Sequence, residues 1–195
     1  MGQYFRPVFF EPTERAPRIT KFYNPHHFMN GAKQVESAYM GNDMYNAIER
    51  DLINNPQHFA SAGDYNSQEK WARNGANLYD LTKTKANSKK AANPDTSDMS
   101  DLPTGMYVLN HTKREFYSRD KIIKDYSLGG MCYNPLALMC ADSCEGGNGD
   151  YEGAGEKNVG RWARDLIEIV SDKAVIPDNY VEIDPGFKPE KWWAD

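Results

Sequence analysis

Aromatic and β-branched residues dominate two stretches near the N-terminus, which is typical of strands. Residues 3–11 and 17–23 have this composition, and the turn-forming region between Pro12 and Pro17 separates them. We therefore expect a β-hairpin. Pro7 has no N–H to donate, which predicts that the first strand lies at a sheet edge or carries a bulge.

The apolar spacing becomes helical after Gly31. One helix is expected from Ala32 to the break at Gly41, with Val35, Ala38 and Tyr39 on one face. A second helix is expected over residues 43–54, because Asn42 is a good N-cap and Asn55-Pro56 stops it. Its buried face consists of Tyr45, Ile48 and Leu52.

The pattern of apolar and turn-forming residues in the rest of the chain predicts four strands and two helices. The strands are expected at residues 57–62, 106–109, 114–117 and 165–170, and the helices at residues 119–126 and 135–141. The sequence DLIEIV at residues 165–170 is the clearest buried strand. Together these elements predict a single α+β domain over residues 1–195, with antiparallel β-hairpins, a central strand and packed helices.

Two regions have weaker patterns. Residues 75–104 carry basic residues first and acidic ones second, with few apolar anchors, so we expect a surface linker or excursion. The alternative is an ordered helix around residues 78–84. Residues 185–195 form a tail that ends in Lys191-Trp192-Trp193. This Trp-rich tail either folds back onto the body, which is favoured, or binds a partner.

Short sequences recur in the two parts of the chain. Gly63-Asp64-Tyr65 and Gly149-Asp150-Tyr151 share a tripeptide, and each is followed by Trp-Ala-Arg, at residues 71–73 and 162–164. The hairpins before them are also alike. This predicts two divergent half-repeats, residues 3–74 and 105–165, around one core. The alternative is that such short matches arose by chance.

The stretch from Asp142 to Asp165 departs most from ordinary composition. Six glycines fall between Gly146 and Gly160, and five carboxylates precede the first basic residue, Lys157. A phosphate-binding loop pairs glycines with a lysine, so this acidic loop disfavours phosphate. Its opening resembles a calcium loop through Asn148, Asp150 and Glu152, but Val159 takes the twelfth position, where calcium loops have glutamate.

No metal is therefore expected, and Asp150 and Glu152 are the candidate ligands if one binds. A solvated loop in which Asp150 binds backbone amides is favoured. The three cysteines, Cys132, Cys140 and Cys144, lack the spacing of a zinc site, and we expect them to be reduced and partly buried. The sequence identifies no cofactor.

Charge and composition narrow the class of protein. The net charge is −5, so a nucleic-acid groove is not expected. No apolar run reaches the length of a bilayer span, and the first residues lack the layout of a signal peptide. Three clustered cysteines do not form a secreted disulfide framework. These features predict a soluble cytoplasmic protein.

Several motifs together resemble a family of small phage and bacterial proteins that open Met-Gly-Gln-Tyr-Tyr. The motifs are Met1-Gly2-Gln3-Tyr4, Pro25-His26-His27-Phe28, Gly63-Asp64-Tyr65, residues 107–116, Gly147-Asn148-Gly149-Asp150-Tyr151 and residues 160–165 with their Gly-x-Trp-Ala motif. The relatives' loop is typically Gly-Asn-Gly-Arg-Gly-Gly-Gly-Asp-Tyr. Here the loop is shorter and lacks the arginine, so no role of that arginine carries over. The family is functionally uncharacterised, and the resemblance implies a phage or mobile-element context.

The leading hypothesis is a non-enzymatic accessory protein that binds a host protein or a small polar ligand. The expected ligand-binding residues are Asp64, Tyr65, Asn148, Asp150, Tyr151, Arg161, Trp162 and Arg164. The two arginines could instead bind carboxylates of their own loop and fix its shape, which is the favoured alternative.

Two other functions stay open. A hydrolase or transferase would use Asp150 with His111 or His26 as a base, with or without a metal, although such histidines more often bind a backbone carbonyl. A virion structural component would use the linker and the tail as docking arms. No complete catalytic set is readable from the sequence.

Overall fold

In the computed structural model, residues 3–66, 69, 72, 75–126, 132–143 and 151–188 are described. One sheet has the order β2-β1-β3-β7-β4-β5-β8, and β6 also pairs with β3. The strands are β1 (Phe5–Glu11), β2 (Arg18–Phe22), β3 (Gln57–Gly63), β4 (Tyr107–Asn110), β5 (Glu115–Ser118), β6 (Ala141–Asp142), β7 (Leu166–Val170) and β8 (Val181–Glu182). The sheet is mostly antiparallel, which confirms the α+β class.

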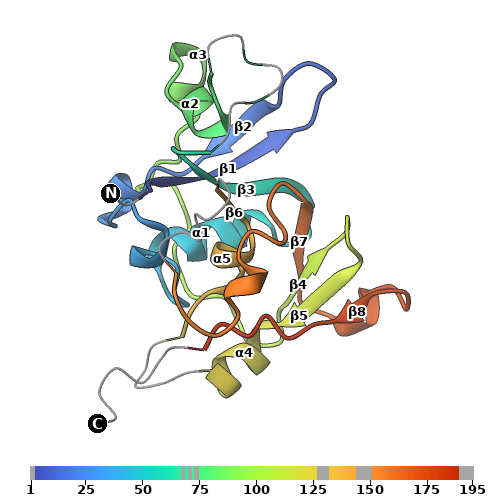
Figure 1. The fold of residues 1–195 in the computed structure, drawn as a ribbon. Helices are drawn as coiled ribbons and strands as arrows, with labels where there is room; N and C mark the ends of the chain where they lie inside the picture. Colours follow the sequence, from blue (N-terminus) through green and yellow to red (C-terminus); the bar gives the residue numbers. More distant parts are fainter. Residues whose placement is uncertain are drawn as a thin grey trace.

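The helices connect these strands. They are α1 (Asp43–Asp51), α2 (Leu78–Thr82), α3 (Lys85–Ser88), α4 (Arg119–Tyr126) and α5 (Pro135–Met139). Four 3₁₀ turns are η1 (Pro25–Phe28), η2 (Gln34–Glu36), η3 (Glu156–Asn158) and η4 (Lys173–Val175). In Figure 1 the β1–β2 hairpin with α2 and α3 lies at one end of the molecule, and β4, β5 and β8 lie toward the other end.

The predicted N-terminal hairpin is confirmed, and of the two alternatives for its first strand, an edge position or a bulge, the structure has the bulge. β1 lies between β2 and β3, and Pro7 stands opposite Ser61 of β3. The strand is also buried on both faces, with Phe9 in the main core and Val8 in a second cluster. Pro7 contributes only its carbonyl on the β2 side, which accepts from Tyr23 N at 2.8 Å. A bulge does occur, between Phe9 and Phe10.

Helix α1 begins as predicted. The Asn42 side chain accepts hydrogen bonds from the backbone N–H groups of Met44 and Tyr45 at 3.1 and 3.3 Å. The predicted face of Tyr45, Ile48 and Leu52 is buried. The helix ends at Asp51, earlier than expected, because the next residues bind β7: Asn54 N donates to Ile169 O at 2.9 Å.

The prediction of a helix from Ala32 is wrong, because only the η2 turn forms there. Tertiary bonds of the buried Gln34 account for this. Its side-chain nitrogen donates to Tyr45 Oη at 2.9 Å and to Ala137 O at 2.7 Å, and its oxygen accepts from Ser61 Oγ at 2.6 Å. These bonds hold the chain against α1, β3 and α5 instead of continuing a helix.

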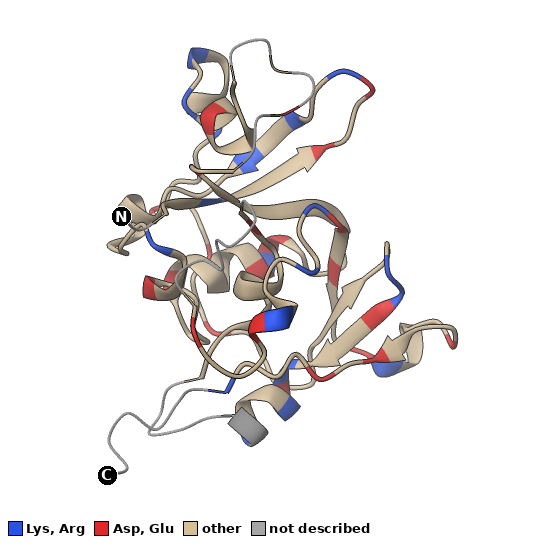
Figure 2. Ribbon diagram, viewed as in Figure 1, with Lys and Arg blue, Asp and Glu red and all other residues tan. Residues whose placement is uncertain are grey.

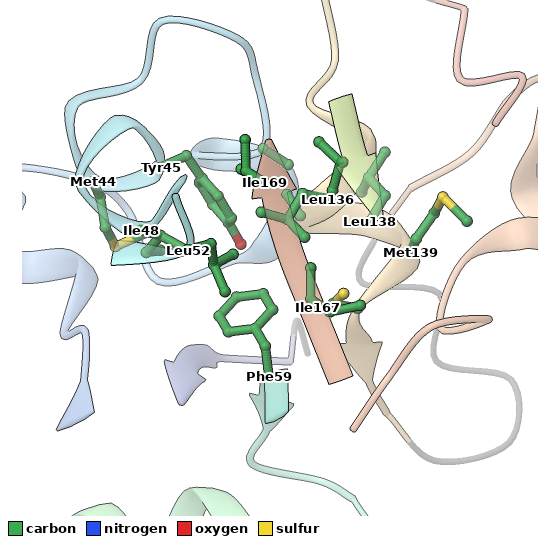
Figure 3. Packing of buried hydrophobic residues seen from close by; sticks show 14 of the residues in the cluster. Met44, Tyr45, Ile48, Leu52, Phe59, Leu136, Leu138, Met139, Ile167 and Ile169 are labelled. Atoms are coloured by element: carbon green, nitrogen blue, oxygen red, sulfur yellow. The ribbon is translucent and has the colours of Figure 1, made fainter. Parts of the chain in front are cut away.

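The main core lies between the sheet and two helices. Figure 3 shows Tyr45 and Ile48 from α1, Leu52 just after it, and Leu136, Leu138 and Met139 from α5 around Phe59 of β3 and Ile167 and Ile169 of β7. β7 is central, as predicted, because it pairs with both β3 and β4. The helix expected to end at Ala141 ends at Met139, since Ala141 and Asp142 pair with β3 as β6.

Residues 75–104 contain two short helices where a linker was expected, so the ordered-helix alternative around residues 78–84 is the one observed. Asn77 caps α2 by accepting from Asp80 N at 3.0 Å. Leu78 and Tyr79 are buried against the second cluster, and the Arg6 guanidinium lies 4.8 Å from the Tyr79 ring centre. Leu78 and Tyr79 thus hold α2 against residues of β1, β2 and β3.

The tail follows the body at least to residue 188. Phe187 is fully buried and packs 5.3 Å from the Tyr151 ring. The tryptophans at 192 and 193 lie outside the described residues.

The sheet order has a two-fold pattern. A hairpin and a third strand, β2-β1-β3, are followed by β7-β4-β5, so each half has a hairpin whose first strand also pairs with a later strand. The counterpart of β3 in this pattern is β7. This strand begins at Leu166, just after the predicted end of the second half-repeat at residue 165. The shared tripeptides do not correspond, since Gly63-Asp64-Tyr65 overlaps the end of β3, whereas Tyr151 and Trp162 precede β7. The half-repeats therefore stay a prediction.

Candidate functional site

The two strands that precede the Gly-Asp-Tyr motifs in the chain lie side by side in the sheet. β3 and β6 are parallel neighbours, with Ser61 opposite Ala141 and Ala62 opposite Asp142. Parallel neighbours end at the same edge, so the turn at Gly63 and the segment after Asp142 begin next to each other. A Cβ at position 63 would lie 3.1 Å from Asp142 O, which shows how closely the two backbones approach.

Arg164 connects these two segments. Its guanidinium Nε and Nη2 atoms each lie 2.8 Å from Asp142 Oδ2, and Nη2 also pairs with the carboxylate of Glu69. Burial lowers the pKa of Arg164, but the bonds to Glu69 and Asp142 outweigh burial and raise it above its ordinary value. The prediction that Arg164 pairs with a carboxylate of its own loop is confirmed.

The backbone of Arg164 is fixed as well. Its φ of 68° lies in the left-handed region, which is uncommon for a residue with a side chain. Arg164 N donates to Phe59 O at 2.9 Å, and Arg164 O lies 3.0 Å from His58 Nδ1. The strand β3 therefore positions the arginine that joins the two segments.

The Gly63-Asp64-Tyr65 turn is held by three backbone or side-chain contacts. Asp64 N donates to Tyr4 O at 2.9 Å, and Asp64 Oδ1 accepts from Tyr4 N at 2.9 Å. Asn77 Nδ2 donates to Asp64 O at 3.2 Å. The side chains of Tyr4 and Tyr65 stay 50% and 51% exposed. The turn is therefore a fixed structure that presents two half-exposed tyrosines.

Two of the expected ligand-binding residues lie in the core. Trp162 is fully buried, stacks 5.7 Å from the Tyr117 ring, and donates its indole N–H to Glu115 at 2.8 Å. Tyr151 is 1% exposed and donates its hydroxyl to Ala154 O at 2.5 Å. Neither side chain is available to a surface ligand, so both act through packing.

Arg161 is exposed and pairs with Glu115 of β5. Asp165 accepts from Asn110 Nδ2 at 2.7 Å and lies 3.6 Å from Lys113 Nζ. Residues 107–116 and 160–165, two of the motifs on which the expected resemblance depends, are thus in direct contact. Asn148, Asp150 and Cys144 lie outside the described residues.

His111 forms a hydrogen-bonded chain that the sequence did not reveal. Its Nδ1 lies 2.8 Å from Tyr180 Oη, and its Nε2 lies 2.9 Å from Glu168 Oε2. An ionised carboxylate can only accept, so we assign the ring proton to Nε2, and Nδ1 then accepts from the Tyr180 hydroxyl. The expected bond of this ring to a backbone carbonyl is not the one found. His26 is exposed on η1, and no described contact joins it to these residues.

The described parts of the chain contain no group of three His, Cys, Asp or Glu side chains that could hold a metal. Glu152 is exposed. Cys132 and Cys140 are free and buried, as predicted. Burial raises the pKa of Cys132 to about 11 and that of Cys140 well above its ordinary value, so neither is a reactive thiolate at neutral pH.

A buried ion pair lies elsewhere in the core. Glu49 of α1 is fully buried, and its Oε2 lies 2.9 Å from Arg119 Nη2, within ion-pair distance but out of line for a hydrogen bond. Asn134 Nδ2 donates to Glu49 Oε1 at 3.1 Å. Burial raises the pKa of Glu49, and Arg119 opposes the shift. The partners come from three helices or their caps, which indicates a structural role.

Comparison with protein-family models, curated proteins and solved structures gave no significant match. Across the described ranges, no helix is long and apolar enough to cross a bilayer.

Proposed function

We propose that this protein is a non-enzymatic accessory protein of a phage or mobile element that binds a host protein in the host cytoplasm. It would bind through a surface that we call the β3–β6 edge, formed by Tyr4, Asp64, Tyr65, Glu69, Asp142 and Arg164. The observation that supports the proposal most directly is the parallel pairing of β3 with β6, which places the ends of these two strands next to each other. Loops on a rigid scaffold are common binding sites, and fixing them before binding lowers the entropic cost.

A host protein fits this edge better than a small ligand. Tyrosines are enriched among residues that dominate protein interfaces, and Tyr4 and Tyr65 are half exposed. The edge has three carboxylates, of which Glu69 and Asp142 share the single guanidinium of Arg164, so the edge is acidic, as is the whole chain. Figure 2 shows the two signs of charge interspersed over the rest of the ribbon in this view. The expected partner therefore has a basic surface, and its binding weakens with salt.

Quantitative affinity capture from host lysate tests the proposal. The bait is the full chain, compared with the double variant Tyr4→Ser, Tyr65→Ser and with Val175→Ser, a control at an exposed apolar residue on η4. We expect a specific partner that the double variant loses and the control keeps. The proposal fails if the same proteins are captured by all three baits. Circular dichroism verifies that each variant is folded.

A second function is favoured by the chain of Tyr180, His111 and Glu168. This arrangement of a hydroxyl, a base and an orienting carboxylate is the one used for nucleophilic catalysis. The Tyr180 oxygen would attack an ester carbonyl or phosphorus while its proton passes to His111 Nδ1. The leaving alcohol would take that proton, and water would then hydrolyse the tyrosyl ester.

Chromogenic carboxylic and phosphoric esters test this second function. Turnover by the wild type that His111→Asn and Glu168→Gln abolish would support it, with His27→Asn as the control at an exposed histidine. Absence of turnover, or equal turnover by all variants, would reject it.

A further inference from the structure

A cavity of 210 Å³ lies beside the start of β3, at the end of that strand away from Gly63. It is lined by Phe10, Glu11, Thr20, Asn55, Pro56, Gln57, His58 and Leu166. The lining comes from the β1–β2 hairpin, the approach to β3 and the first residue of β7. The lining shares no residue with the β3–β6 edge, so the inference concerns a different site from the proposed host-protein surface.

The two amide side chains in the lining have defined orientations. Asn55 Nδ2 and Gln57 Nε2 lie 2.8 and 3.1 Å from the same acceptor, the carbonyl oxygen of Asp51. Because a carbonyl only accepts, the nitrogen of each amide must face Asp51. Each nitrogen keeps a second N–H, and no described contact supplies either amide oxygen with a donor.

The position of the His58 ring proton follows from the same reasoning. Its Nδ1 lies 3.0 Å from Arg164 O, which can only accept, so Nδ1 carries the proton of the neutral ring. Nε2 is then a lone-pair acceptor, with no donor among the described contacts. The ring packs 5.8 Å from the Phe10 ring at 35°, which gives the cavity an aromatic side.

The lining therefore has more acceptors than donors. The amide oxygens of Asn55 and Gln57 and His58 Nε2 accept, and the exposed Glu11 carboxylate adds negative charge while pairing with Arg18. Phe10, Pro56 and Leu166 supply apolar surface. The donors here are the Thr20 hydroxyl and the second N–H of each amide, and the one charged group of the lining is the Glu11 carboxylate, so a donor-rich cation is favoured over an anion.

We infer that this cavity binds a guanidinium group carried on a short apolar stem. A guanidinium presents five N–H donors in a plane, which suits several separate acceptors, and it stacks on aromatic rings. Pockets for drug-sized ligands begin near about 300 Å³, so a cavity of 210 Å³ suits a single side-chain-sized group. The group belongs to an arginine side chain of a polypeptide or to a free guanidino compound.

NMR titration of the ¹⁵N-labelled full chain tests this inference. The probes are n-butylguanidinium and its neutral planar isostere n-butylurea, and the blocked peptides Gly-Arg-Gly and Gly-citrulline-Gly. We expect saturable shifts at the backbone amides of residues 10, 11, 55, 57, 58 and 166 with the guanidinium probes only. Tighter binding of the arginine peptide than of n-butylguanidinium assigns the site to polypeptides, and the reverse order assigns it to free compounds.

Variants connect the shifts to the cavity. His58→Phe keeps a ring but removes the acceptor, and it should weaken guanidinium binding about tenfold, the usual effect of losing a hydrogen bond to a charged group. His27→Phe, at an exposed histidine of η1, should leave binding unchanged. The inference is overturned if n-butylguanidinium gives no saturable shift, if n-butylurea binds equally well, or if folded His58→Phe binds as the wild type does.

Discussion

Arg164 binds Asp142 through two nitrogens, each 2.8 Å from the same carboxylate oxygen, although 22 residues separate them in the chain. The same guanidinium also pairs with Glu69, which follows the other Gly-Asp-Tyr motif. One side chain therefore holds the two segments of the β3–β6 edge together. The geometry of the proposed binding surface depends on this arginine.

Removing this connection should weaken the fold and loosen the edge. We expect Arg164→Ala to lower the free energy of unfolding by about 1–2 kcal/mol, because it leaves two partly buried carboxylates without their cation. Arg164→Gly should cost less, since glycine adopts the positive φ of this position without strain. Urea unfolding measures both. Equal losses would show that the backbone conformation is not strained.

Gly63 should not accept a larger residue. A Cβ there would lie 2.1 Å from Gln3 Nε2 as well as 3.1 Å from Asp142 O. We expect Gly63→Ala to cost about 1–3 kcal/mol of stability. The Gln3→Ala, Gly63→Ala double variant should recover part of this loss. It removes the clash with the Gln3 side chain but leaves the close contact with the backbone oxygen of Asp142. No recovery would indicate that the contact with Asp142 O dominates.

The buried ion pair should dominate the mutational sensitivity of the core. Arg119→Met leaves the Glu49 carboxylate buried without its cation, and we expect a loss of about 3–5 kcal/mol. Arg114→Met is the control, since Arg114 is exposed. Thermal or urea unfolding compares the two variants. A loss for Arg119→Met no larger than the control's would contradict the structural role.

Glu49 also gives stability a specific dependence on pH. Its pKa is raised in the folded state above its ordinary value of 4.5, so the folded protein holds this proton more tightly than the unfolded chain. The stabilising contribution of the protonated group is complete below 4.5 and is lost as pH rises through the raised pKa. Relative to wild type, Glu49→Gln should therefore gain stability as pH rises through this range. Parallel stability curves for the two proteins would contradict the shift.

The sequence predicted local structure well where the signal was local. The N-cap at Asn42, the apolar face of α1 and the apolar run that gives β7 all depend on residues close in the chain. The missing helix after Ala32 did not follow from such signals, because Gln34 is held by bonds to Tyr45, Ser61 and Ala137. Tertiary hydrogen bonds of this kind leave no periodic pattern.

The candidate site was predicted in part. Motifs pointed to Asp64, Tyr65 and Arg164, and the structure places them on neighbouring segments. Trp162 and Tyr151 belonged to the same motifs but pack inside, since sequence spacing cannot separate a surface aromatic from a core one. Glu168 and Tyr180 join His111 only through the strand pairing of β4 with β7 and the path of the tail over β5.

The most direct test of the β3–β6 edge is photocrosslinking from position 65. A photoreactive phenylalanine analogue replaces Tyr65 in one protein and Val175 in another, and each is irradiated in host lysate. We predict one dominant covalent adduct from position 65 that is absent from position 175 and decreases as salt is raised. No adduct from position 65, or the same adducts from both positions, would contradict the proposed function.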